Sequence, residues 1–216
     1  MTIYNDSHSR YITELFAQPD SVLQHVYDAI PKRGLPAITI KPEEGRFLQF
    51  LVAACGARTA VEIGTLGGYS GIWLARGLSS TGKLITLERE PRHADVAREH
   101  FALAGLSNRV EIRLGDAHAL LPGLAAEGPF DVCFIDAEKE GYNAYLDWAL
   151  RNIRPGGIIA AHNAFRQGAV VDPANHEADT ELMRAFNRRF AAEPRLLATI
   201  FPAGDGMVIG VVKNRD

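Results

Sequence analysis

Short apolar segments rich in β-branched residues alternate along the chain with longer segments of helical spacing. The predicted strands are residues 59–63, 83–87, 110–114, 130–135 and 158–161, and the predicted helices between them are 69–78, 91–104, 117–126 and 142–152. This alternation is typical of an α/β fold, in which helices cover both faces of a parallel sheet. The run 132–135 is continuously apolar, as expected of a strand buried on both faces. We therefore predict a mainly parallel sheet.

The two ends of the chain complete this sheet. A predicted helix at 177–191 precedes strands at 196–201 and 207–212, and the Gly204-Asp205-Gly206 turn between these strands indicates a hairpin. Residues 7–55 have apolar residues at helical spacing but no strand. The chain has no low-complexity linker, and its 47% of hydrophobic residues suffice for one core. We predict a single domain over 1–216, with an N-terminal helical layer at 1–55 and a core at 56–216.

Charge and cysteine content narrow the class of partner. The formal net charge is only −3 with both signs interspersed, which excludes the basic surface of a nucleic-acid or membrane-binding protein and favours a small-molecule partner. The N-terminus lacks a secretory leader, and no stretch is long enough to cross a membrane, so we predict a cytoplasmic protein. Cys55 and Cys133 form no CxxC pair, which excludes a cysteine-based zinc site.

A glycine-rich loop follows the first strand, in the sequence Glu62-Ile-Gly-Thr-Leu-Gly-Gly-Tyr-Ser70. Glycines at a strand-to-helix turn let a ligand approach the backbone closely. The position two before Gly64 is Glu62, whereas a dinucleotide fingerprint has glycine there. A carboxylate disfavours a pyrophosphate, and so an NAD-type oxidoreductase, but suits the sulfonium and ammonium groups of S-adenosylmethionine.

Acidic residues close the next two strands. Glu88 lies 24 residues after Gly64, where a carboxylate can accept hydrogen bonds from both ribose hydroxyls. Asp116 follows the third strand, where it can contact the adenine amino group, cap the next helix, or do both. Together with the glycine loop, these residues predict a nucleoside ligand.

Several motifs together resemble the cation-dependent O-methyltransferases, the family of catechol and caffeoyl-CoA O-methyltransferases. They are Pro42-Glu-Glu-Gly-Arg-Phe-Leu48, the glycine loop, Gly115-Asp-Ala117, the stretch from Phe130 to Lys139 with Tyr142 and Tyr145, and Pro202-Ala-Gly-Asp-Gly206. The resemblance implies a Rossmann-like methyltransferase fold with a seven-stranded sheet and one antiparallel strand, a homodimer, and S-adenosylmethionine as cofactor. The cofactor residues expected from the loop and from the resemblance are Ile40, Glu62, Gly64, Thr65, Tyr69, Ser70, Glu88, Asp116, Ala117 and Asp136.

Asp136 ends the fourth strand and His162-Asn163 end the fifth, so all three should meet at the carboxyl edge of the sheet. The family has two aspartates and an asparagine at these positions, which hold a magnesium-like cation that grips two adjacent substrate hydroxyls. His162 replaces the second aspartate. A neutral imidazole suits manganese, zinc or a similar metal better than magnesium.

Three interpretations of His162 follow: a metal ligand with Asp136 and Asn163, a general base without metal, or a structural imidazole. Lys139 matches the family's catalytic lysine, which accepts the acceptor's proton or stabilises its oxyanion. Trp148 and Tyr145 belong either to the core or to the acceptor pocket, and Arg166 and Asp205 either border the acceptor or are a loop charge and a turn residue.

The predicted function is methyl transfer from S-adenosylmethionine to a hydroxyl of a small molecule, with an ortho-dihydroxy aromatic as acceptor. Lys139, Asp136 and His162 are the candidate catalytic residues. Two alternatives remain: a metal-independent small-molecule methyltransferase with His162 or Lys139 as base, and a cofactor-binding protein whose catalytic site has decayed.

Overall fold

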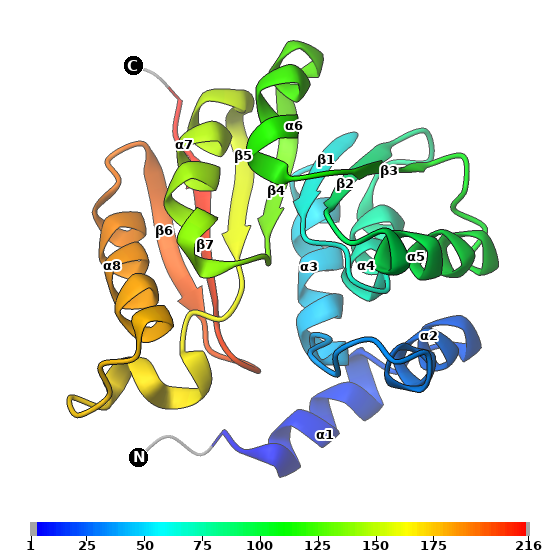
Figure 1. Cartoon of the computed structure of the whole chain (residues 1–216), viewed down its shortest axis with the longest axis horizontal. Coiled ribbons are helices and arrows are strands. Elements are labelled where there is room, and N and C mark those ends of the chain that lie inside the picture. The colour runs from blue at the N-terminus through cyan, green and yellow to red at the C-terminus, as the bar shows by residue number, and fades with distance from the viewer. Residues whose placement is uncertain (1–3, 215–216) are drawn as a thin grey trace.

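The computed structural model describes residues 4–214, so the outermost residues of the predicted 1–216 unit lie outside it. A seven-stranded sheet forms its centre, in the order β3-β2-β1-β4-β5-β7-β6 (Figure 1). The strands are β1 Thr59–Ile63, β2 Lys83–Glu88, β3 Val110–Leu114, β4 Phe130–Ile135, β5 Ile153–Ala161, β6 Leu196–Phe201 and β7 Met207–Val212. All seven were predicted, and the differences lie at their ends.

The direction of each strand follows from its connections. Strands β1 to β5 run parallel, while β7 pairs antiparallel with both β5 and β6. This confirms the predicted single antiparallel strand and the hairpin. Strand β5 begins at Ile153, earlier than predicted, because Ile153 pairs with Phe130 before the register shifts and Val132 pairs with Ile158. The Pro155-Gly156-Gly157 segment at this irregularity has the composition of a turn.

Two groups of helices cover the two faces. Helices α2 Ser21–Lys32, α3 Pro42–Ala54, α4 Tyr69–Gly77 and α5 Pro91–Leu103 contribute to one apolar cluster, and α6 Ala117–Leu124, α7 Tyr142–Asn152 and α8 Ala178–Ala192 contribute to the other. Val132 and Phe134 point to the first cluster, whereas Cys133 and Ile135 point to the second. This alternation explains why the sequence of β4 is apolar at every position.

The N-terminal segment is helical, as predicted. Helix α1 Asp6–Phe16 is capped by Asn5, whose side chain accepts from two backbone N–H groups, and Asp20 caps α2 by accepting from the backbone N–H of Leu23. Helix α3 packs against α4, whereas α1 and α2 lie beyond the edge at which β4 and β5 end (Figure 1). The segment between α2 and α3 therefore reaches the carboxyl ends of the strands. Within residues 4–214, no helix has the length and apolarity needed to cross a membrane.

Candidate active site

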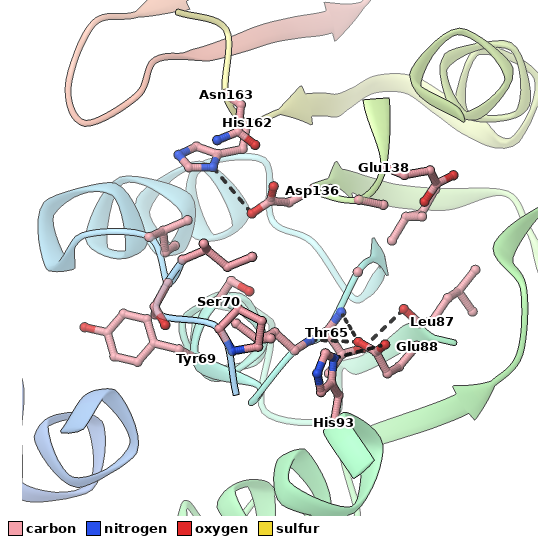
Figure 2. Close-up of a pocket in the computed structure, with 18 of the residues that line it drawn as sticks. Thr65, Tyr69, Ser70, Leu87, Glu88, His93, Asp136, Glu138, His162 and Asn163 are labelled. Atoms are coloured by element: carbon pink, nitrogen blue, oxygen red, sulfur yellow. Dashed lines mark hydrogen bonds and ion pairs between the residues drawn. The ribbon is translucent and has the colours of Figure 1, made fainter. Parts of the chain in front are cut away.

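A cavity of about 1100 Å³ opens at the carboxyl ends of β1 to β5 (Figure 2). Strands β1 and β4 are neighbours although β2 and β3 lie between them in sequence, so the cavity lies where the strand order reverses, as in other doubly wound sheets. Its wall includes Ile40, Gly64, Thr65, Tyr69, Ser70, Glu88, Asp116, Ala117, Asp136, Lys139, His162 and Asn163. Of the predicted site residues, only Glu62 is missing from this wall.

The glycine loop is shaped by close contact with β4. Gly64 has a φ of +97°, and a Cβ atom there would lie 2.1 Å from the carbonyl oxygen of Asp136. Gly68, with a φ of +82°, precedes the first turn of α4. A side chain at either position would require a backbone conformation that only glycine adopts readily. The loop therefore holds its backbone against the end of β4.

Glu88 is fixed by the same loop. Its Oε2 accepts hydrogen bonds from the backbone N–H groups of Thr65 (3.2 Å) and Leu66 (2.8 Å), and its Oε1 accepts one from Glu90 (2.9 Å). The Nδ1 atom of His93 lies 3.6 Å from Oε1 (Figure 2). Because both lone pairs of Oε2 are used and only one of Oε1 is, Oε1 keeps one lone pair that can accept from a ligand hydroxyl.

Glu62, a predicted cofactor residue, does not line the cavity. Its carboxylate lies behind the cavity wall, where it accepts hydrogen bonds from the hydroxyls of Ser70 (2.5 Å) and Thr86 (2.7 Å). Burial raises the pKa of Glu62 to about 7, although these two hydrogen bonds oppose the shift. In this structure, Glu62 reaches the cavity only through Ser70.

Asp116 caps helix α6. Its side chain accepts from the backbone N–H of His118 at 2.7 Å, as one of the two interpretations predicted. Asp116 also lines the cavity.

Lys139 lies at the opposite end of the cavity. Its ammonium donates to the carbonyl of Ala137 (2.8 Å), the hydroxyl of Tyr142 (2.7 Å) and Oδ1 of Asn163 (2.7 Å), and Asp136 Oδ1 is 3.9 Å away. The side chain is only 9% exposed. Burial lowers the pKa of Lys139 and outweighs the attraction of Asp136. A lysine held in this way is suited to exchange a proton.

His162 lies between two carboxylates. Its Nε2 is 2.8 Å from Oε1 of Glu44, and its Nδ1 is 3.4 Å from Oδ2 of Asp136 (Figure 2). Burial alone would lower the pKa of His162, but Asp136 and Glu44 together raise it to about 10. The same pairing, with Lys139, holds the pKa of Asp136 below its usual value despite its burial. A general base must be unprotonated at neutral pH, and this raised pKa disfavours that role for His162.

Glu44 was not among the candidate residues, although it lies in the quoted Pro42–Leu48 motif. Its Oε2 accepts from the backbone N–H of Lys41 at 2.9 Å, as a helix-capping glutamate does. The cap explains the residue locally, and no sequence spacing indicates that its Oε1 meets His162, 118 residues away. Tyr142 was also missed as the partner of Lys139.

The family comparison agrees with this geometry. Residues 13–213 match the family model described as O-methyltransferase. The chain is 42% identical over 96% of its length to a catechol O-methyltransferase of Niastella koreensis, of which it covers 97%, and 41% identical over 83% to one of Mycobacterium tuberculosis, of which it covers 83%.

The chain belongs to the O-methyltransferase family. A solved O-methyltransferase from Bacillus cereus, in complex with SAH, superposes with a TM-score of 0.88 at 42% identity, covering 96% of this chain and 97% of that one. The O-methyltransferase TomG from Streptomyces achromogenes, in complex with SAM, gives 0.88 at 34% identity over 96% of both chains.

Two aromatic residues of this O-methyltransferase had open assignments. Trp148 is buried and its indole N–H donates to the carbonyl of Leu121 at 2.8 Å, which places it in the core. Tyr145 lines the cavity, donates to Glu138 and stacks on His118. Of the two, Tyr145 alone is therefore positioned to contact a ligand.

Proposed function

We propose that this O-methyltransferase transfers the methyl group of S-adenosylmethionine to one hydroxyl of an ortho-dihydroxy aromatic. The observation that carries the proposal is the continuity of the cavity, in which the glycine loop and Glu88 share one open space with Asp136 and Lys139. A cofactor and an acceptor therefore meet without a wall between them. Methyl transfer requires this arrangement, because the attacking oxygen must reach the methyl carbon in line with the departing sulfur.

The cofactor is placed by the loop and Glu88. The nucleoside fits between Glu88, whose Oε1 can accept from a ribose hydroxyl, and Asp116 with Ala117 on the adenine side. The methionine end then extends along Gly64, Tyr69 and Ser70, under the segment that contains Ile40. The relatives crystallised with SAH and SAM have nearly the same fold, which supports this ligand class.

Lys139 is the proposed base. In its unprotonated form, its amine takes the proton of the acceptor hydroxyl, the oxygen forms a bond to the methyl carbon, and the carbon–sulfur bond breaks. The products are the methyl ether, S-adenosylhomocysteine and the lysine ammonium, which releases its proton to water. The lowered pKa of Lys139 increases the fraction of free amine at neutral pH. Ala137, Tyr142 and Asn163 hold the ammonium in place, and the neutral amine, which has two N–H groups, gives up one of these three contacts so that its lone pair can face the acceptor hydroxyl.

The acceptor class follows from the groups around Lys139. Asp136 is the nearest carboxylate and can accept a hydrogen bond from a second hydroxyl next to the reacting one. Relatives at 42% and 41% identity are named catechol O-methyltransferases, which supports a vicinal diol.

The residues present fit the predicted divalent metal in part. Asn163 directs its Oδ1 to the Lys139 ammonium and its amide N–H to Asp205 at 2.9 Å. Nε2 of His162 pairs with Glu44, whereas its buried Nδ1 lies 3.4 Å from Oδ2 of Asp136 without a hydrogen-bond partner and is available to a cation. Among the described residues, no three His, Cys, Asp or Glu side chains form a group able to hold a metal ion. The ligand set of Asp136, His162 and Asn163 therefore stays a prediction, and the steps of the reaction above are carried by the residues of the chain itself.

A panel assay tests the function. Purified protein is incubated with S-adenosylmethionine and with catechol, phenol, aniline or 3,4-dihydroxybenzoate, and S-adenosylhomocysteine and methylated products are measured by mass spectrometry. We expect methyl ethers from the two diols. Products only from the amine would refute oxygen transfer. Tight binding of S-adenosylhomocysteine by calorimetry, with no product from any acceptor, would favour the cofactor-binding alternative.

The homodimer implied by the resemblance is also a proposal. Tyr11, Leu15, Phe16 and Phe50 expose more than half of their side chains, and a second cavity of about 340 Å³ is lined mainly by apolar residues of α1, α3 and β6. A second copy of the chain would remove this surface from water. Light scattering of the wild type and of Phe50→Lys measures the mass, and a monomeric wild type would refute the proposal.

The cytoplasmic location remains a prediction from the sequence.

A further inference from the structure

The glycine loop is held from outside the cavity by helix α5. The Nδ1 atom of His100, near the C-terminal end of this helix, lies 2.7 Å from the carbonyl oxygen of Gly67. Gly67 lines the cavity, whereas His100 is 3% exposed and lies behind the cavity wall. Because a carbonyl oxygen only accepts hydrogen bonds, Nδ1 carries the proton and donates it.

This hydrogen bond does not depend on the charge of the ring. Burial lowers the pKa of His100, and the hydrogen bond with Gly67 opposes this shift only in part, so the ring is neutral at pH 7. The proton on Nδ1 is present both in this neutral tautomer and in the imidazolium. A neutral donor of similar reach, such as the amide of asparagine, should therefore be able to replace the ring.

The loop needs such support because its backbone is strained. Leu66 has a φ of +48°, a conformation that few residues other than glycine adopt, and Gly68 has a φ of +82°. Such conformations persist only where the surrounding contacts enforce them. Glu88 holds the backbone N–H of Leu66 at 2.8 Å, and His100 holds the carbonyl of Gly67. The loop is thus fixed by one hydrogen bond on each side of its strained peptide.

The packing around Gly67 leaves little room for another position of the loop. A Cβ atom at Gly67 would clash with the side chain of Ile30, a fully buried residue of α2, and a Cβ atom at Gly68 would lie 2.9 Å from the ring of Phe101 on α5. The loop is therefore enclosed between α2 and α5. If His100 could not donate, the buried carbonyl of Gly67 would lose this partner, and the loop would have to shift to bring the oxygen to water.

We propose that His100 is a positioning residue for the cofactor, which holds the carbonyl of Gly67 so that the glycine loop keeps the conformation that receives S-adenosylmethionine. The proposal rests on the cofactor placement proposed above. A loop that is already in position does not have to be ordered when the ligand binds, and this increases affinity. Since His100 lies outside the cavity, its loss should weaken cofactor binding and leave the proton transfer at Lys139 unchanged once the cofactor is bound.

Calorimetry with S-adenosylhomocysteine tests the proposal without an acceptor. His100→Leu removes the donor and should raise the Kd by about tenfold, whereas His100→Asn, whose amide N–H lies near the position of Nδ1, should stay within about threefold of the wild type. Val96→Ala is the matched control, because Val96 is equally buried on α5 and makes no hydrogen bond to the loop. It should lower the stability in urea and leave the Kd within about twofold of the wild type.

Three results would overturn the proposal. They are a folded His100→Leu variant with the wild-type Kd, a His100→Asn variant as weak as His100→Leu, and a Val96→Ala variant as weak as His100→Leu. The last result would mean that cofactor affinity follows general stability. His100→Phe, which keeps a ring without a donor, takes the place of His100→Leu if that variant does not fold.

Initial rates separate positioning from chemistry. His100→Leu should raise the KM for S-adenosylmethionine by about tenfold and leave kcat within about twofold, and a lowered kcat with an unchanged KM would contradict the proposal. Because the Kd measurements need no acceptor, failure to methylate a diol would leave this inference intact. A wild type that binds no S-adenosylhomocysteine would overturn the cofactor placement and this inference with it.

Discussion

Replacement of Glu44 by glutamine tests whether its hydrogen bond with His162 stabilises the fold. Glu44 is 1% exposed and uses both oxygens, one for His162 and the other for the backbone N–H of Lys41. Glutamine has nearly the same size but only one oxygen. If the glutamine oxygen keeps the Lys41 N–H, its NH₂ group faces Nε2 of His162, which can then only be paired as an unprotonated acceptor; if the amide turns, the Lys41 N–H loses its acceptor.

The expected loss follows from these two contacts. A hydrogen bond to a charged group contributes about 1.5–3 kcal/mol, and an unsatisfied buried donor costs about 1–3 kcal/mol. Because the two effects overlap at one side chain, we expect Glu44→Gln to lower the free energy of unfolding by about 2–4 kcal/mol. His162→Gln should also destabilise the protein, since it leaves Glu44 buried without its partner.

A double-mutant cycle separates this interaction from general damage. The free energy of unfolding in urea is measured at pH 7 for the wild type, Glu44→Gln, His162→Gln and the double variant. We expect the sum of the two single losses in the free energy of unfolding to exceed the loss in the double variant by about 1 kcal/mol or more. If the single losses in the free energy of unfolding sum to the loss in the double variant within about 0.5 kcal/mol, Glu44 and His162 are not coupled, and their hydrogen bond does not stabilise the fold.

Three further changes test other parts of the site. Lys139→Met should lower kcat by about 10²-fold or more while the Kd of S-adenosylhomocysteine stays the same, and an unchanged kcat would exclude Lys139 as the base. Gly64→Ala should lower the free energy of unfolding by about 1–3 kcal/mol, because its backbone is strained and its Cβ would meet the carbonyl of Asp136; wild-type stability in urea would contradict this. Glu62→Gln should change the pH dependence of stability: burial raises the pKa of Glu62 from 4.5 to about 7, so stability gained below pH 4.5 is lost as pH rises through 7. The variant should therefore gain stability relative to the wild type between pH 5 and pH 8, and parallel pH profiles would contradict the assignment.

Local sequence patterns were sufficient for the elements of the fold and for the carboxyl edge of the sheet. Strand and helix periodicity located all seven strands, and the positions of Glu88, Asp136 and His162 at strand ends placed them in one cavity. Side chains of a strand alternate between the two faces of the sheet, and this also explains where Glu62 of β1 points. Its neighbours Val61 and Ile63 face the cluster on the α6, α7 and α8 side, so Glu62 faces α4.

The partners of His162 could not be predicted in this way. The contact with Glu44 joins residues 118 positions apart, and the capping role of Glu44 gives a complete local explanation for a glutamate at its position. The occupation of Asn163 by Lys139 likewise depends on side-chain directions at the end of the sheet. Such contacts arise from tertiary packing, and no local sequence pattern specifies them.

Tracing the methyl group gives the most direct test of the proposed function. S-adenosylmethionine carrying a ¹³C-labelled methyl group is incubated with the enzyme and catechol, and the product is examined by NMR and mass spectrometry. The cavity predicts a labelled methyl ether on one of the two oxygens, with one S-adenosylhomocysteine formed for each product molecule. Label found on nitrogen or carbon of any acceptor, or cofactor consumed without a labelled ether, would contradict transfer to a hydroxyl beside Lys139.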